Sequence, residues 1–284
     1  MKNLLTLLLI CLSFKLLAQT DPELKFDQPF VKCEKKWVIL NRSETDKGYT
    51  FGYIYIDSQA GFTFDMQGVF AVDPSGKYVR DTVIFKNTGA IKYRIAPNWR
   101  PVALLPPKHF DELKIKAEPD WVKIYYTYTD TLAHNYRWGW IYNDINDSQT
   151  ALTYLEKTYK VKPHYPGVEF EMTFAYNALG RFNEAITLLE PAIRNDPKNT
   201  FFYKELAYAY FHTQQYEKAI STYKVGLEYF PNERSEARGE FAFNMANAYK
   251  VLKNEAEYKA WMIKAKEYTP TNSRYYKAII DAGF

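Results

Sequence analysis

Cysteine is scarce in this 284-residue sequence, which contains two, at positions 11 and 33. We expect Cys11 to be removed with an N-terminal signal, which leaves Cys33 alone and excludes an intrachain disulfide. Cys33 is interpreted as a small buried hydrophobe in a strand rather than a reactive thiol. The four histidines are scattered along the chain, and we interpret each of them as a lone surface residue.

Catalytic and nucleotide-binding signatures are also missing. The sequence has no His-Glu-x-x-His, Cys-x-x-Cys, Gly-x-x-x-x-Gly-Lys-Ser/Thr or Gly-x-Ser-x-Gly pattern. Acidic residues lie mostly beside lysines, as is typical of solvated helix faces. The sequence therefore predicts a protein that is not an enzyme, without a cofactor and without a metal site.

Charge of one sign does not dominate the chain. It has 37 basic and 33 acidic residues, a net charge of +4, and the signs are interspersed. Because no cluster of lysine and arginine is present, we do not expect nucleic acid as a partner. The composition, with 47% hydrophobic and 25% charged residues, is that of a globular protein of one or two domains.

The sequence has no hydrophobic run long enough for a transmembrane helix. The apolar stretch 4–14 is about 11 residues long, against the roughly 20 that a span needs. Together with the small Ala18 it forms a signal-peptide pattern over residues 1–18, so we expect export to the periplasm of a bacterial cell envelope, or secretion, and no stable span after cleavage. The alternative is an uncleaved anchor. Lipidation is rejected because Ile10, which is not small, precedes Cys11.

The next predicted module spans residues 19–130. From about residue 29 to residue 129 its apolar residues alternate with the period of two that is typical of strands. The predicted strands are 30–33, 37–40, 49–56, 62–64, 68–72, 78–80, 82–85, 91–95 and 121–128. A proline-rich passage is predicted as edge or connection, and 109–113 as a short helical turn. Many short strands with frequent turns favour a β-rich module of the sandwich or barrel-like type. We identify no family resemblance in this module.

Two features of this module have a functional and a structural interpretation. Its aromatic residues could form a platform for sugars, but alternating Tyr and Phe more simply fill a sheet face. Asp57, Asp65 and Asp73 recur at intervals of eight, which suggests a cation site. Because the spacing matches no calcium loop, we favour aspartates at strand ends in turns.

After residue 130 the apolar pattern becomes helical and repeats. Pro163, Pro197 and Pro231 are 34 residues apart. Other positions share this spacing: Ala151, Ala185 and Ala219; Leu155, Leu189 and Tyr223; Thr158, Ala192 and Gly226; Tyr142, Tyr176 and Tyr210. A fixed period near this length is typical of stacked helical hairpins, in which small residues let two helices approach closely.

On these residues the C-terminal part resembles a tetratricopeptide repeat array. The second unit has Tyr176, Gly180, Phe182, Ala185, Leu189, Ala192 and Pro197, and the third has Tyr203, Leu206, Ala207, Tyr210, Tyr216, Ala219, Tyr223 and Pro231. The implied domain is 131–284, with units at about 132–165, 166–199, 200–233 and 234–271 and a capping helix at 272–283. Pro231 and Pro270 are 39 residues apart, so about five extra residues are expected to lengthen the first helix of the fourth unit.

The resemblance implies a concave groove, lined by the first helices, that holds a peptide. The groove positions are Tyr136, Trp140, Phe170, Phe174, Asn177, Lys204, Tyr208, Phe211, Phe243, Asn247 and Lys250. This set is aromatic with a few amide and ammonium donors, and it differs from the carboxylate-binding type of the family. We therefore expect a segment of another protein that contains aromatic residues, or the protein's own β-rich module.

The predicted architecture is multi-domain with α and β parts, a β-rich module followed by an α-helical repeat solenoid. The first functional hypothesis is a noncatalytic scaffold or adaptor of the cell envelope that binds another protein or peptide. The alternative is that the β-rich module binds a carbohydrate or small ligand while the repeats serve as a stalk. A third hypothesis, an enzyme in the β-rich module, is disfavoured by the missing motifs.

Overall fold

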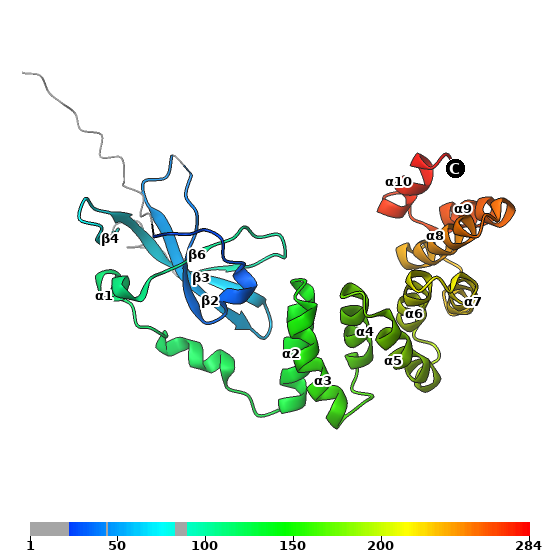
Figure 1. The fold of residues 1–284 in the computed structure, drawn as a ribbon, viewed down its shortest axis with the longest axis horizontal. Helices are drawn as coiled ribbons and strands as arrows, with labels where there is room; N and C mark the ends of the chain where they lie inside the picture. Colours follow the sequence, from blue (N-terminus) through cyan, green and yellow to red (C-terminus); the bar gives the residue numbers. More distant parts are fainter. Residues whose placement is uncertain (1–22, 44, 83–89) are drawn as a thin grey trace, which may run out of the picture. The chain divides into compact units, whose positions relative to one another are not determined.

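The computed structural model describes residues 23–43, 45–82 and 90–284. The chain forms two compact units, one up to Thr127 and one from Tyr128 onward (Figure 1). The predicted signal peptide and most of the strand predicted at 82–85 lie outside the described residues.

The first unit is built on one antiparallel sheet with the strand order β4-β3-β2-β1-β6, and β5 also pairs with β3. The described strands are β1 (Lys36–Ile39), β2 (Tyr49–Asp57), β3 (Gly61–Val72), β4 (Tyr78–Arg80), β5 (Ile91–Arg94) and β6 (Ala103–Leu104). The long β3 pairs with β5 along its N-terminal half and with β4 at its C-terminal end. The predicted β-rich class is confirmed. The sequence left open a sandwich or a barrel-like arrangement, and the described strands form one sheet instead.

The aromatic residues of the strands form the core of this unit. Phe51, Tyr53 and Tyr55 alternate along β2 and are fully buried. They share one core with Leu113 and Val122, which belong to short helical segments outside the sheet. The interpretation of the alternating aromatics as fillers of a sheet face therefore agrees with their burial, and these rings are not exposed as a sugar platform.

Two predicted strands are helical instead. Residues 30–33 form the 3-10 helix η1 (Phe30–Cys33), and most of 121–128 belongs to η3 (Asp120–Tyr126). In a strand Val122 and Ile124 would share one face, but Val122 is buried while Ile124 is 70% exposed. The apolar residues of this segment fit a helical period as well as an alternating one, so the sequence pattern is ambiguous there.

Smaller differences concern the other short segments. The strands predicted at 62–64 and 68–72 are parts of the continuous β3. The helical turn predicted at 109–113 is confirmed by η2 (Pro107–His109) and α1 (Phe110–Leu113). The proline-rich passage contains the short strand β6, which lies at the edge of the sheet. An edge position is expected there, because a proline lacks the N–H that a central strand would need.

The compact unit from Tyr128 onward, which we call the helical domain, consists of consecutive helical hairpins. They follow one another along the chain from green to red in Figure 1. Its helices are α2 (Thr131–Asp144), α3 (Ser148–Val161), α4 (Val168–Ala178), α5 (Phe182–Asn195), α6 (Thr200–His212), α7 (Tyr216–Leu227), α8 (Glu236–Val251), α9 (Glu255–Tyr268) and α10 (Arg274–Asp281). Pro163, Pro197 and Pro231 lie in the connections that follow α3, α5 and α7. They break the second helix of each unit because proline has no N–H and clashes with the preceding turn.

Small residues allow the helices of neighbouring hairpins to approach. Ala151, Ala185 and Ala219 are fully buried at equivalent positions of the second helices. At Gly226 on α7 a Cβ atom would lie 2.5 Å from Phe241 Cε1 and 2.8 Å from Tyr203 Cβ. Close packing of this kind leaves no room for a methyl group without displacement of a neighbour.

The fourth repeat unit, at about 234–271, departs from the regular spacing, as predicted. α8 is 16 residues long, whereas α4 has 11 and α6 has 13. The helix predicted to cap the array is present as α10, with Ile279 buried on it. The next residue, Ile280, is 43% exposed.

α10 is placed like the first helix of a further unit. Its Tyr275 ring lies 5.8 Å from the ring of Phe243 on α8. Phe201 on α6 lies 5.3 Å from Phe170 on α4 at a nearly equivalent pair of positions. The end of the array is therefore covered by repetition of the same helix packing.

We predict that Gly226→Ala destabilises the protein by about 1–3 kcal/mol, because the new methyl group overpacks the contact with Phe241 and Tyr203. Thermal unfolding followed by circular dichroism measures the effect. Ser221→Ala, on the exposed face of the same helix, is the control and should change stability by less than about 0.5 kcal/mol. Equal melting temperatures for Gly226→Ala and the parent chain would contradict the packing argument.

Candidate functional site

The first helices of the array are joined by a repeated side-chain interaction. Asn143 Nδ2 on α2 donates to the backbone oxygen of Glu171 on α4 at 2.9 Å and to its carboxylate Oε2 at 2.8 Å. One repeat later, Asn177 Nδ2 on α4 donates to the backbone oxygen of Glu205 at 3.1 Å and to its Oε2 at 2.9 Å. We call each of these pairs an Asn–Glu clip. All four side chains are buried, so the clips satisfy polar groups that would otherwise be costly to bury.

The clip is absent between the third and fourth units. The position 34 residues after Asn177 is occupied by Phe211, and the position 39 residues after Glu205 is occupied by Asn244. These residues cannot form the same pair, because phenylalanine has no polar group. α2 packs on α4 and α4 on α6, whereas α6 and α8 make hardly any close backbone contact. The array therefore opens where the clip is lost.

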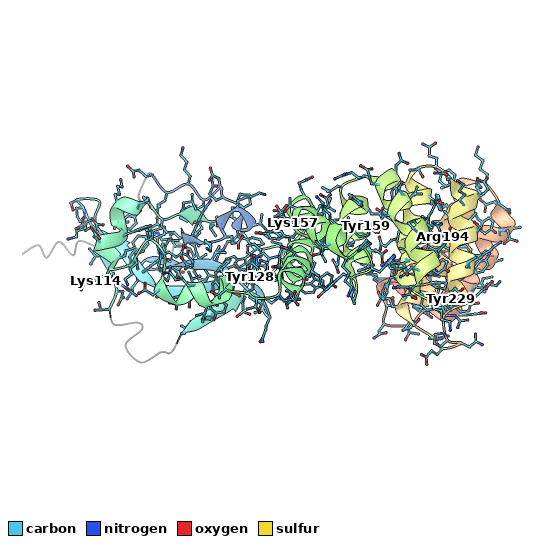
Figure 2. The ribbon with its side chains drawn as sticks, turned by 90° about the horizontal axis from the view of Figure 1, so that it is seen from below. Lys114, Tyr128, Lys157, Tyr159, Arg194 and Tyr229 are labelled. Atoms are coloured by element: carbon cyan, nitrogen blue, oxygen red, sulfur yellow. The ribbon has the colours of Figure 1, made fainter. Side chains whose placement is uncertain are left out.

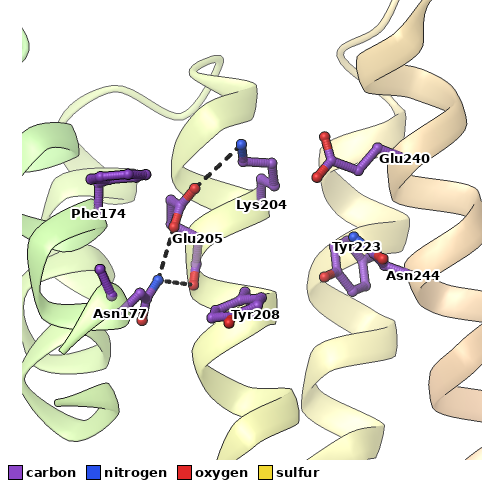
Figure 3. A pocket seen from close by; sticks show the side chains of 9 residues that line it. Phe174, Asn177, Lys204, Glu205, Tyr208, Tyr223, Glu240 and Asn244 are labelled. Atoms are coloured by element: carbon purple, nitrogen blue, oxygen red, sulfur yellow. Dashed lines mark hydrogen bonds and ion pairs between the residues drawn. The ribbon is translucent and has the colours of Figure 1, made fainter. Parts of the chain in front are cut away.

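A pocket of about 300 Å³ lies at this opening, and we call it the α6–α8 pocket (Figure 3). It is lined by Phe174, Asn177 and Ala178 of α4, by Lys204, Glu205 and Tyr208 of α6, by Tyr223 of α7, and by Glu240 and Asn244 of α8. The first helices form its walls, and the ring of Tyr223 reaches it from a second helix. The pocket is thus lined mainly by the first helices, on which the groove residues were predicted.

Charged groups face one another in the α6–α8 pocket. Lys204 Nζ lies 3.3 Å from Glu205 Oε1, and Figure 3 shows Glu240 extending toward Lys204 from the opposite wall.

Two tyrosines near these carboxylates have raised pKa values. Burial and the negative charges of Glu240 and Glu205 raise the pKa of Tyr223 above its ordinary value. Burial and a hydrogen bond to Glu240 raise the pKa of Tyr275 to about 12. Both phenols are therefore neutral hydrogen-bonding groups at physiological pH.

The structure brings four of the predicted groove residues together in this pocket: Phe174, Asn177, Lys204 and Tyr208. Asn177 is not the free donor that the sequence suggested, because both contacts of its amide nitrogen belong to the clip. Phe174 and Tyr208 are 36% and 41% exposed, so part of each ring is available to a ligand, and the ring of Tyr208 also lies 4.3 Å from that of His212.

The remaining predicted groove residues lie outside the pocket: Tyr136, Trp140, Phe170, Phe211, Phe243, Asn247 and Lys250. Most of their side chains contact a neighbouring ring. Phe170 packs on Phe201 and Phe243 on Tyr275, and Lys250 Nζ lies 5.2 Å from the ring centre of Tyr258. These contacts are within the array, so several of these aromatics contribute to helix packing.

The sequence interpretation missed Glu205, Tyr223, Glu240 and Asn244. Tyr223 shares a register with Leu155 and Leu189 and is buried like them, so its position in the sequence indicates the core and not the pocket that it also borders. A signal for Glu205 was present, since Asn143 and Asn177, and likewise Glu171 and Glu205, are each 34 residues apart. Polar residues that recur at the repeat period indicate an interaction between neighbouring units.

Two further grooves run between the second helices. One of about 640 Å³ lies between α3 and α5 and includes Tyr159, and one of about 290 Å³ lies between α5 and α7 and includes Arg194. Figure 2 labels these two residues on the helices. A hydrogen bond recurs beside them, from Tyr176 Oη to Glu156 at 3.4 Å and from Tyr210 Oη to Glu190 at 2.9 Å. These grooves therefore follow from the regular repeat, unlike the α6–α8 pocket.

Other candidate sites do not combine into chemistry. In the described part of the chain, no three His, Cys, Asp or Glu side chains gather closely enough to hold a metal ion. Asp57 and Asp73 accept backbone hydrogen bonds in turns, whereas Asp65 is buried within β3, not at a strand end. Burial raises the pKa of Cys33 to about 11, which disfavours a reactive thiolate.

One histidine differs from the prediction of surface residues. His109 is buried, its ring stacks on Tyr78 at 3.6 Å, and its Nδ1 lies 2.7 Å from Glu112 Oε2. Through these two contacts His109 links β4 with α1, so it supports the fold of the β-rich unit.

Among residues 23–43, 45–82 and 90–284, no helix is both long and apolar enough to cross a lipid bilayer.

Comparison with known proteins identifies the repeat. Residues 178–239 match the family model described as Tetratricopeptide repeat. The chain is 20% identical to TTC0263, a thermophilic TPR protein of Thermus thermophilus, over 53% of this chain and 80% of that one, with a TM-score of 0.46. It is 19% identical to a MamA fragment of Desulfovibrio magneticus over 49% and 75% of the two chains, with a TM-score of 0.44. No curated protein matches the sequence.

The compact unit from Tyr128 onward is a tetratricopeptide repeat array, in agreement with its helical hairpins, its 34-residue period and the family match. Repeats of this kind stack into extended concave surfaces that bind other proteins. The unit therefore has the architecture of a protein-interaction scaffold.

The clip at Asn143 predicts a pH-dependent effect on stability. Burial raises the pKa of Glu171 above its ordinary value, although the hydrogen bond from Asn143 partly opposes this. A carboxyl group with a raised folded-state pKa stabilises the fold when protonated, and this contribution is lost as the pH rises through that pKa. Glu171→Gln should therefore raise the melting temperature at pH 7. The gain should shrink as the pH falls through the raised pKa of Glu171 and should be absent below about 4.5, the ordinary pKa of the group.

The control for this prediction is Glu184→Gln. Glu184 is exposed, and its hydrogen bond from Arg181 lowers its pKa, so this change should give no gain at pH 7. Thermal unfolding of both variants between pH 4 and pH 8 measures the difference. A melting temperature of Glu171→Gln that is lower than that of the parent at pH 7 would contradict the prediction.

Proposed function

We propose that this chain is a noncatalytic adaptor that binds a segment of another protein in the α6–α8 pocket. The observation that supports the proposal is the pair of exposed rings, Phe174 and Tyr208, beside Lys204, Glu205 and Glu240. Aromatic side chains that anchor in or around a pocket contribute most of the binding energy in many interfaces. The polar groups around them fix the position of the bound segment.

We further propose that the protein acts in the bacterial cell envelope, after export to the periplasm or the cell surface. This proposal rests on the signal-peptide pattern of residues 1–18. The adaptor would then bind its partner outside the cytoplasm. The aromatic residues of the first unit give no comparable support for a carbohydrate site, because those of the strands are largely buried.

Site-specific crosslinking tests the adaptor function. A photoreactive phenylalanine analogue at position 208 should capture a discrete partner in cells that express the full chain. When the analogue is placed at Lys204 instead, Phe174→Ala and Tyr208→Ala should each reduce recovery of that partner at least about tenfold, since hot-spot truncations cost about 2 kcal/mol or more. Ile263→Ala, a change at a 53% exposed residue of α9, should leave recovery unchanged. Equal recovery in all variants would remove the α6–α8 pocket as the binding site.

A further inference from the structure

The α6–α8 pocket offers more hydrogen-bond acceptors than donors. Glu205 and Glu240 contribute carboxylates, which only accept hydrogen bonds. Lys204 is the one cation among the lining residues, so the three charged side chains sum to a net charge of −1. A ligand group that carries a positive charge and several N–H donors complements this surface, whereas a peptide carboxylate would be repelled.

The amide oxygen of Asn177 adds no contact for a ligand. Its Nδ2 serves the clip with Glu205, so the orientation of the amide is fixed, and its Oδ1 is a buried acceptor with almost no accessible surface. Asn143 Oδ1, which lies outside the α6–α8 pocket, is left without a partner in the same way by the first clip. These unpaired oxygens are therefore a feature of the clips, and the preference for a cation rests on the carboxylates and the rings.

The aromatic residues of the pocket add a requirement of shape. Phe174 and Tyr208 extend from α4 and α6 on either side of the Asn177–Glu205 clip (Figure 3). Flat cationic groups stack on such rings and are stabilised by the negative potential of the ring face. A guanidinium group combines a positive charge, a planar shape and five N–H donors, whereas an ammonium group is compact and more strongly hydrated.

We infer that the α6–α8 pocket binds an arginine side chain of the partner segment. This inference rests on the proposed function and names the chemistry that the pocket recognises. The guanidinium group lies between the rings of Phe174 and Tyr208 and donates to Glu240, whose carboxylate also accepts a hydrogen bond from Tyr275. Lys204 neutralises Glu205 from within the protein and competes with the ligand for it.

The pocket owes this chemistry to the break in the repeat. Glu240 and Asn244 lie on the lengthened α8, and the ring of Tyr223 borders the pocket where α6 and α8 are not joined by a clip. Between α2 and α4, and again between α4 and α6, a clip joins the first helices directly. The arginine site is therefore a property of one interface and not of the repeat as such.

Peptide binding to the full chain tests the inference directly. The probes are four acetylated and amidated pentapeptides with alanine at the outer positions and arginine, citrulline, lysine or glutamate at the centre. 3-Fluorotyrosine at position 208 reports binding by its ¹⁹F resonance. We expect the arginine peptide to shift this resonance saturably and to bind at least about tenfold more tightly than citrulline, which has the same shape without the charge.

Variants of the pocket charges sharpen the test. Glu240→Gln should weaken the arginine peptide about tenfold, because it removes a carboxylate that faces the guanidinium group. Lys204→Ala should strengthen binding severalfold, because it removes the competing cation. Glu217→Gln, which removes a negative charge from a position outside the pocket, is the matched control and should leave affinity unchanged.

The possible outcomes separate the inference from the proposed function. Tighter binding of the glutamate peptide, equal binding of arginine and citrulline, or an unchanged affinity in Glu240→Gln would overturn the arginine site. Equal binding of lysine and arginine would overturn the choice of guanidinium. If these tests fail while the crosslink from the analogue at position 204 still depends on Phe174 and Tyr208, the adaptor function stands without the arginine site. If the crosslink fails as well, both are wrong.

Discussion

The spacing of the first helices in this array depends on a buried hydrogen bond between side chain and backbone. In each clip one asparagine amide donates to both the backbone oxygen and the carboxylate of a glutamate on the next first helix. A buried donor of this kind has to be satisfied, so the clip fixes the distance and the register of two helices together. Alanines on the second helices allow close approach on the other side of each hairpin, and the two constraints define one regular repeat.

The proposed binding site, the α6–α8 pocket, lies where this constraint is lifted. Phe211 and Asn244 replace the clip, α8 is lengthened, and α6 and α8 separate enough to leave a pocket. Tyr223, whose register is that of a core residue, then borders this pocket. A repeat protein can thus acquire a specific site by the loss of one packing interaction, while the stability of the array is carried by the other units.

Much of the helical unit could be predicted from the sequence, because the alanines and prolines recur at a fixed spacing and each has a direct steric role. The pocket could be predicted only in part. Phe174 and Tyr208 follow from the phase of the first helices, whereas Glu240 and Tyr223 depend on how far α6 and α8 separate, which no local pattern encodes. In the first unit the error at 121–126 has a similar cause, since its apolar residues satisfy two periods and only burial against the sheet selects the helix.

The central claim is that loss of the clip opens the α6–α8 pocket. A restored clip, made by Phe211→Asn together with Asn244→Glu, tests it most directly. Spin labels at His212 on α6 and Val251 on α8 report the distance between the two helices by pulsed electron spin resonance. The account predicts a shorter and narrower distance distribution in the double variant than in the parent chain. An unchanged distribution in a folded double variant would contradict it and assign the separation of α6 and α8 to the lengthened helix alone.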